Sequence, residues 1–285
     1  MSGPLLQAQA LSRTFGAFTA VDQVTFDVAP GEVVGLLGAN GAGKTTVIRM
    51  LLGLLRPTAG HALLNGNPPS RAGRERLGYV PQGLGLYAEL TVRENLEFAA
   101  QAFGCPPARP EGPMRETRDR LVSDLPLGIR RQVAFLCALQ HRPDVLVLDE
   151  PSSGVEPLGR ARLWDQIRGQ SQRGVGVLVT THYMQEAQQC DRLLLMSQGR
   201  LVAQGTEADI VDGTTAVAVA SDDWARVFAV LSAAGLAVNL AGRDVRVIDP
   251  DLPVVRELLA GQGIEAGFHE VPATIEERMT MLART

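Results

Sequence analysis

The chain has 285 residues, a formal net charge of −4 and a hydrophobic content of 45%. This length is enough for one large domain and a small one, each with its own core. The slightly acidic balance, without a cluster of Lys and Arg, argues against a nucleic-acid surface. No apolar run approaches the roughly 20 residues that span a bilayer, so we expect no transmembrane segment. Three cysteines lie far apart in the sequence and predict reduced, buried thiols rather than a metal site. They are Cys105, Cys137 and Cys190.

The first half of the chain begins with an alternating apolar pattern over residues 5–28, which predicts an antiparallel sheet. Residues 32–37 then read as a buried strand, and residues 47–52 as the start of a helix. Between them, residues 38–46 read Gly-Ala-Asn-Gly-Ala-Gly-Lys-Thr-Thr, the complete pattern of a phosphate-binding loop. The strand, loop and helix therefore predict a site for a nucleoside triphosphate.

The residue types of this loop explain the chemistry. Glycines let backbone N–H groups approach phosphate oxygens, and the following helix directs its positive N-terminus at the same anion. Lys44 is expected to reach the β- and γ-phosphates, and the Thr45 hydroxyl to hold Mg²⁺. An ordinary glycine-rich turn is the competing interpretation, which the Lys-Thr pair disfavours. The expected nucleotide-binding residues are Gly38, Asn40, Gly41, Gly43, Lys44, Thr45 and Thr46.

Further short apolar runs alternate with helical periodicity and predict a largely parallel sheet covered by helices, an α/β fold. They occupy residues 77–80, 145–148, 175–179 and 193–196. Asp149 and Glu150 follow the second run, at the strand edge where α/β sheets place ligands. Asp149 is expected to orient Mg²⁺, and Glu150 to accept a proton from the attacking water or to hold that water in line. A solvated helix cap is the alternative, which the upstream loop disfavours.

The pattern changes at about residue 206, which divides the chain into domains 1–206 and 207–285. Strands are expected at 215–220, 236–240, 244–248 and 264–271, and helices at 222–233, 251–261 and 274–282. The first six elements have the order β-α-β-β-α-β, which is typical of a ferredoxin-like unit. No catalytic cluster falls inside it, so we expect a regulatory, dimerising or partner-docking domain.

Taken in order, these motifs resemble the nucleotide-binding subunit of ATP-binding-cassette (ABC) transporters over residues 5–206. The resemblance implies that Phe15 stacks on adenine and that Gln82 senses Mg²⁺ and the γ-phosphate. It also implies that Asp149 is the metal-binding aspartate, Glu150 the catalytic glutamate and His182 the switch histidine. Without the resemblance, Phe15 reads as a core aromatic, Gln82 as a turn residue and His182 as a structural hydrogen-bonding group.

The resemblance further implies an ATPase that binds ATP and Mg²⁺ and dimerises head to tail around two ATP molecules. The run at residues 180–187, Thr-Thr-His-Tyr-Met-Gln-Glu-Ala, is similar to the branch that drives exporters of drugs, lipids or polysaccharides. We therefore expect a membrane-spanning permease as partner and a cytoplasmic, peripheral location at the cell membrane. A nucleotide-dependent regulatory module and a soluble cassette that acts on ribosomes or DNA are the alternatives.

The sequence departs from the family at the signature Leu-Ser-Gly-Gly-Gln, which clamps the partner's γ-phosphate. The aligned residues 125–129 are Leu-Pro-Leu-Gly-Ile, so Gly128 remains while Pro126 offers neither hydroxyl nor N–H. Losing one charge-assisted hydrogen bond costs roughly 1.5–3 kcal/mol. We expect reduced activity, with a weak homodimer or a heterodimer with a second cassette of intact signature. Prolines at residues 106–113 also predict a shortened helical subdomain.

Overall fold

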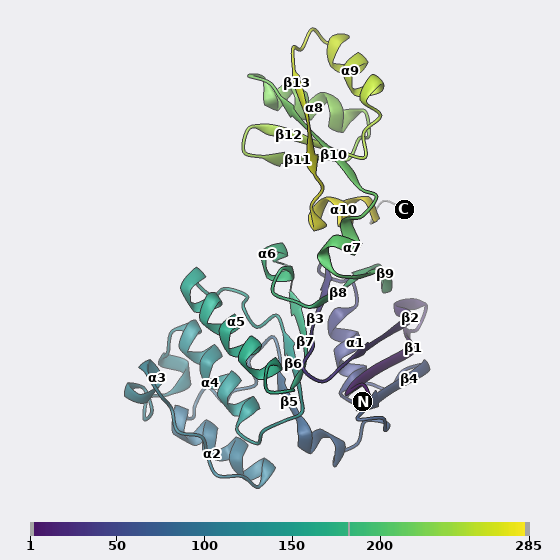
Figure 1. The fold of residues 1–285 in the computed structure, drawn as a ribbon. Helices are drawn as coiled ribbons and strands as arrows, with labels where there is room; N and C mark the ends of the chain where they lie inside the picture. Colours follow the sequence, from purple (N-terminus) through teal and green to yellow (C-terminus); the bar gives the residue numbers. More distant parts are fainter. Residues whose placement is uncertain (1–2, 182, 283–285) are drawn as a thin grey trace. The chain divides into compact units, whose positions relative to one another are not determined.

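The computed structural model describes residues 3–181 and 183–282, and the chain divides into two compact units, Met1–Gln204 and Gly205–Thr285 (Figure 1). We call the first unit the cassette and the second the C-terminal domain. Thr206 belongs to the C-terminal domain, where its side chain accepts a hydrogen bond from the backbone N–H of Asp209 and begins helix α7 (Glu207–Val211). Within the described residues, no helix combines the length and the hydrophobicity needed to cross a membrane.

A six-stranded sheet with the order β5-β6-β7-β3-β8-β9 forms the centre of the cassette. The pairs β5–β6, β6–β7, β7–β3 and β3–β8 are all parallel, which confirms the predicted sheet. The strands are β3 (Val33–Gly38), β5 (Leu77–Val80), β6 (Val145–Asp149), β7 (Gly176–Thr181), β8 (Arg192–Ser197) and β9 (Arg200–Gly205). Because parallel strands end at the same edge, the residues that follow β3, β6 and β7 come together there.

Helices cover both faces of this sheet. Successive residues of a strand point to opposite faces, so each strand contributes side chains to two cores. Val147 of β6 packs in one core with Ile48, whereas its neighbour Leu146 packs in the other with Trp164. The first core is closed by α1 (Lys44–Leu51), and the second by α4 (Leu127–Leu139) and α5 (Pro157–Ser171). The strands are therefore buried on both faces, which explains their continuous apolar runs.

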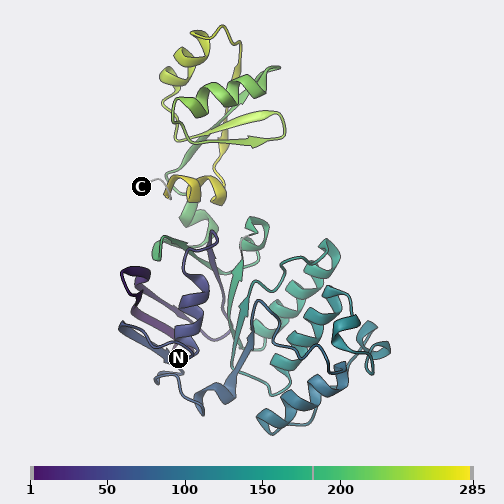
Figure 2. The same ribbon diagram turned by 180° about the vertical axis from the view of Figure 1, so that it is seen from behind.

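An antiparallel sheet with the order β2-β1-β4 lies beyond α1, as the alternating pattern of the first residues predicted (Figures 1 and 2). Its strands are β1 (Leu6–Phe15), β2 (Phe18–Val28) and β4 (Ala59–Leu64). The inward side chains of this sheet, such as Leu11 and Val24, share the α1 core. Helix α1 is thus held between two sheets, which fixes the orientation of its N-terminus.

Further helices complete the cassette. They are η1 (Gly73–Arg76), α2 (Val92–Phe103), α3 (Pro113–Glu116), η2 (Val122–Asp124) and α6 (Met184–Ala187). Helix α2 begins with a capping box at Thr91 and ends at Gly104 (φ +63°), and Pro113 is the first residue of the four-residue α3. The segment between α2 and α4 therefore holds only α3 and η2, consistent with the prolines in its sequence.

The C-terminal domain has the element order predicted from the sequence, β-α-β-β-α-β followed by a helix. The elements are β10 (Thr215–Ala220), α8 (Trp224–Ala233), β11 (Val238–Ala241), β12 (Asp244–Ile248), α9 (Leu252–Ala260), β13 (Gly267–Pro272) and α10 (Ile275–Leu282). The strands pair antiparallel in the order β11-β12-β10-β13, and α8 and α9 pack on one face. An ion pair between Arg246 and the buried Glu277 fastens α10 to β12.

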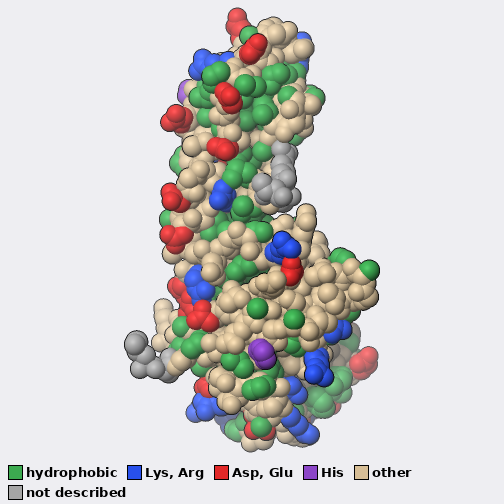
Figure 3. Space-filling model, turned by 90° about the vertical axis from the view of Figure 1, so that its right-hand side faces the viewer, with side chains coloured by type: hydrophobic (Ala, Val, Ile, Leu, Met, Phe, Trp, Pro, Cys, Tyr) green, Lys and Arg blue, Asp and Glu red, His purple; other side chains and the backbone are tan. Residues whose placement is uncertain are grey.

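The surface carries charges of both signs. On the face of the cassette drawn in Figure 3, Lys and Arg side chains are interspersed with Asp and Glu side chains. The cysteines differ from expectation, because all three are free but keep part of their surface exposed. None is deep enough in a core to be completely covered, although Cys137 and Cys190 pack at the edges of cores.

Candidate functional site

The phosphate-binding loop joins β3 to α1 at the edge where the parallel strands end. Gly43 has φ +102°, and a Cβ there would lie 2.6 Å from the carbonyl oxygen of Ala20, so only glycine fits. Gly41 has φ +84° and faces open space, since a Cβ there would meet no atom within 4 Å. Helix α1 begins without a side-chain cap. Its first N–H groups are therefore available to an anion in that space.

Lys44 is buried in this loop, with 5% of its surface exposed. Its Nζ donates hydrogen bonds to the carbonyl oxygens of Gly38 (2.7 Å) and Ala39 (3.1 Å). Burial lowers the pKa of Lys44, while the carboxylates of Glu150 and Asp149 raise it in part. A charge that costs desolvation energy in this way gains most when an anion binds beside it.

Asp149 ends β6 and is held by two threonines. Its Oδ1 accepts a hydrogen bond from Thr180 Oγ1 (2.7 Å), and its Oδ2 accepts one from Thr45 Oγ1 (3.2 Å). The same Thr180 oxygen accepts a hydrogen bond from the backbone N–H of Glu150 (2.8 Å). Thr180 is fully buried, so one hydroxyl satisfies two neighbouring groups of the site. In the sequence, Thr180 carries no sign of this role, since it only follows the apolar run at residues 175–179.

Glu150 follows directly and has φ +50°, a left-handed conformation that residues with a side chain rarely adopt. Its Oε2 accepts a hydrogen bond from Gln82 Nε2 (3.1 Å), although the two residues are far apart in the sequence. Gln82 lies two residues after the end of β5. Because β5 pairs in parallel with β6, Gln82 and Glu150 reach the same edge of the sheet, which explains the contact. Strained backbone of this kind concentrates at functional sites.

The oxygen atoms at this edge suit Mg²⁺. Thr45 Oγ1 and a carboxylate oxygen of Asp149 lie within hydrogen-bond distance of each other beside the open loop. Hard cations prefer such oxygens, and Mg²⁺ on a nucleotide needs few protein ligands because phosphate and water supply the rest. The residues present therefore fit a magnesium–nucleotide complex.

Two other predicted residues lie on other elements, and a third cannot be placed. Phe15 lies at the end of β1 with 46% of its surface exposed, under the guanidinium of Arg13 at 4.5 Å, so it is not a core aromatic. Gly128 is the second residue of α4, whose N-cap Pro126 supplies no side-chain hydrogen bond. His182 lies outside the described residues.

The comparisons with known proteins agree with this geometry. A family model described as ABC transporter matches residues 21–153. The Nod factor export ATP-binding protein I of Burkholderia thailandensis is 35% identical over 293 residues, which cover 97% of this chain and 96% of the relative. The chain belongs to the ABC transporter ATP-binding family.

Two further comparisons place this cassette within the family. The probable multidrug ABC transporter ATP-binding protein YbhF of Escherichia coli K12 is 42% identical over 219 residues, or 72% of this chain. The match spans only 38% of that relative's length. A solved ATP-binding subunit of an ABC transporter superposes with a TM-score of 0.67 and 32% identity, over 72% of this chain and 91% of that one. This agreement confirms the predicted α/β cassette fold.

Proposed function

We propose that this chain is the ATP-hydrolysing subunit of an ABC exporter. The observation that carries the proposal is the convergence of Lys44, Thr45, Asp149 and Glu150 at one sheet edge. Hydrogen bonds join Thr45 to Asp149 and, through Thr180, Asp149 to Glu150, while both carboxylates raise the pKa of Lys44 in part. The names of the relatives, which include multidrug and Nod factor export ATP-binding proteins, support export as the process. The chain would act on the cytoplasmic face of the membrane.

Each residue has a distinct part in the proposed reaction. Lys44 leaves its loop carbonyls and pairs with the β- and γ-phosphates, while the glycine N–H groups and the start of α1 bind the remaining oxygens. Glu150 accepts a proton from the attacking water or holds that water in line, and Gln82 orients the Glu150 carboxylate. Thr45 and Asp149 would hold Mg²⁺, which would supply charge neutralisation on the phosphates. Phe15 stacks on adenine, and His182 contacts the γ-phosphate.

The reaction would take place in a dimer. The N-terminus of α4 has no side-chain cap, and a Cβ on Gly128 would meet no atom within 4 Å, so this helix end can approach a phosphate of a partner cassette. Pro126 and Leu127 remove polar contacts there, which predicts slower hydrolysis or weaker closure. The partner cassette is either a second copy or a cassette with a complete signature.

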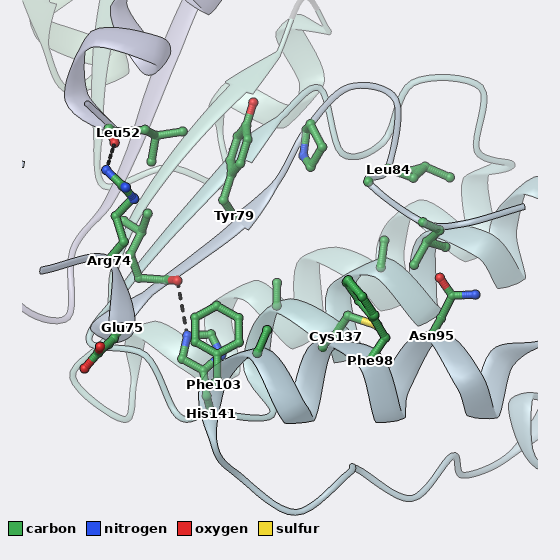
Figure 4. Close-up of a pocket in the computed structure, with 18 of the residues that line it drawn as sticks. Leu52, Arg74, Glu75, Tyr79, Leu84, Asn95, Phe98, Phe103, Cys137 and His141 are labelled. Atoms are coloured by element: carbon green, nitrogen blue, oxygen red, sulfur yellow. Dashed lines mark hydrogen bonds between the residues drawn. The ribbon is translucent and has the colours of Figure 1, made fainter. Parts of the chain in front are cut away.

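A groove beside Gln82 is suited to the membrane-spanning partner. It encloses about 500 Å³ and is lined by side chains from the segment after β5, from α2 and from the end of α4 (Figure 4). Phe98 and Tyr87 expose about half of their surface there, at 50% and 48%. Exposed aromatic surface of this kind marks interaction sites. Pro81, which precedes Gln82, lines the groove, so this segment would connect partner binding to the nucleotide site.

The test is the steady-state ATPase rate of the purified chain at increasing protein concentration, for wild type and Glu150→Gln. We expect a rate that rises more than linearly and that the substitution abolishes while ATP binding persists. Glu116→Gln, which changes an exposed carboxylate of α3, is the control and should match wild type. ATP binding with no hydrolysis in wild type would instead favour a regulatory module or an obligatory second cassette.

Membrane coupling needs a separate test, because hydrolysis alone does not show transport. We expect the chain to copurify with a polytopic membrane protein rather than with ribosomes. Phe98→Asp should abolish this association without reducing the basal ATPase rate, because Phe98 lies in the groove and not at the nucleotide site. Copurification with ribosomes would contradict the export function.

A further inference from the structure

A buried guanidinium connects helix α4 to the loop that carries Glu150. Arg131 has 8% of its surface exposed. Its Nη1 donates hydrogen bonds to the carbonyl oxygens of Glu150 (3.1 Å) and Pro151 (2.8 Å), and its Nη2 donates to that of Ser153. Three carbonyl groups within four consecutive residues therefore converge on one side chain. The planar guanidinium holds its N–H donors in a fixed arrangement that can bind several carbonyl oxygens at once. A lysine ammonium cannot reproduce this arrangement.

These bonds hold a backbone segment that is strained by itself. Glu150 has φ +50°, and such a conformation persists only where the surroundings fix it. Thr180 binds the N–H of Glu150, and Arg131 binds its carbonyl oxygen. Both sides of this residue's backbone are thus held by neighbouring elements. The direction of its side chain depends on both contacts.

A second contact joins the same two elements. Gly154 has φ +72°, and a Cβ there would lie 3.0 Å from Leu127 Cδ2. Leu127 is the first residue of α4, so the first turn of the helix packs directly on the loop that Arg131 holds. Helix α4 and residues 150–154 consequently form one contiguous unit, with an apolar contact at one end and the guanidinium at the other.

We propose that Arg131 is a positioning residue for Glu150. It fixes the backbone on the carbonyl side of Glu150, so that the carboxylate faces the phosphate-binding loop. It also ties this carboxylate to the helix that carries Gly128. The catalytic consequence rests on the proposed function, in which Glu150 acts on the attacking water.

The test compares Arg131→Lys with the neighbouring Arg130→Lys. Both keep the positive charge on α4, but among the described residues the carbonyl oxygens of Glu150, Pro151 and Ser153 accept hydrogen bonds from Arg131 and none from Arg130. In Arg131→Lys we expect kcat to fall on the order of 10- to 100-fold, because small misplacements of a catalytic group have effects of this size. The dissociation constant for ATP should stay unchanged. Backbone amides of residues 150 and 152–155 should exchange hydrogen faster than in Arg130→Lys.

Equal kcat and equal amide exchange in the two variants would overturn the proposal. A parallel loss of kcat, ATP affinity and melting temperature in Arg131→Lys would also overturn it, since that pattern indicates a general structural role. An inactive wild type would contradict hydrolysis by this chain alone, and with it the catalytic consequence. The exchange comparison would still decide whether Arg131 fixes the backbone at Glu150.

Discussion

Replacing Thr180 by Val tests how the two carboxylate-bearing residues of the site are held. Valine has nearly the same shape as threonine, so the packing at this fully buried position is retained while the hydroxyl is lost. Asp149 Oδ1 then loses its donor, and the backbone N–H of Glu150 loses its acceptor. The substitution therefore affects polar contacts and leaves the core volume almost unchanged.

The magnitude follows from these two bonds. A hydrogen bond to a charged group contributes about 1.5–3 kcal/mol, and a buried donor left without a partner costs about 1–3 kcal/mol. The free energy of unfolding of the cassette should fall by about 3–5 kcal/mol. Domains of 150–250 residues lose about 2–4 °C in melting temperature per kcal/mol. We therefore expect the melting temperature to fall by about 10 °C. The affinity for Mg²⁺ and ATP should also fall, because Asp149 loses the hydrogen bond that orients its carboxylate.

Differential scanning calorimetry of the complete chain measures this effect, with the cassette transition assigned by its shift on adding ATP. Thr180→Ser is the matched control, because it keeps the hydroxyl and loses one methyl group, at a cost of about 0.8 kcal/mol plus a small cavity term. Thr180→Val should be clearly less stable than Thr180→Ser. Equal melting temperatures of the two variants would refute the reasoning.

Three other predictions concern the loop, a thiol and the C-terminal domain. Gly43→Ala should destabilise the cassette by about 3 kcal/mol or more, because its Cβ meets a backbone carbonyl. Gly41→Ala should cost about 1–2 kcal/mol of stability and mainly weaken ATP binding. Thermal melts measure the stability of both variants, and ATP titrations measure their affinity. Burial raises the pKa of Cys137 to about 12, so the unfolded chain loses this proton first. Above the ordinary thiol pKa, Cys137 should therefore lower the free energy of unfolding by about 1.4 kcal/mol per pH unit in urea titrations. Glu277→Gln breaks the buried pair with Arg246 and should destabilise the C-terminal domain by about 3–5 kcal/mol in a thermal melt.

Each of these predictions has a defined contrary result. Equal stability of the Gly41 and Gly43 variants would contradict the steric argument. For the thiol, Cys137→Ala should lower the alkaline slope by about 1.4 kcal/mol per pH unit and leave the share of Cys190, whose pKa burial also raises to about 12. An unchanged slope would assign it to other groups. For the C-terminal domain, a Glu276→Gln variant at the neighbouring position in the first turn of α10 is the control. A similar melting temperature for the two Glu variants would show that the ion pair contributes little.

The sequence by itself determined the cassette and its local motifs, because these depend on short-range patterns. Doubly buried strands read as apolar runs, and the glycines between residues 38 and 43 are required by a loop whose chemistry is local. The order of elements in the C-terminal domain was likewise predicted from periodicity and turn residues, with strands β10 and β12 at the expected residues. The paired carboxylates at residues 149–150 were found because they end a strand.

Only the tertiary structure decided which distant residues hold the site together. Thr180 and Arg131 carry no sequence signal, since a threonine at a strand end and an arginine in a helix are ordinary. Their importance comes from strand β7 lying beside β6, and from α4 packing over the loop after β6. The partial exposure of the cysteines and of Phe15 was also set by packing. Burial and hydrogen-bond partners depend on contacts between segments far apart in the chain, which local patterns do not encode.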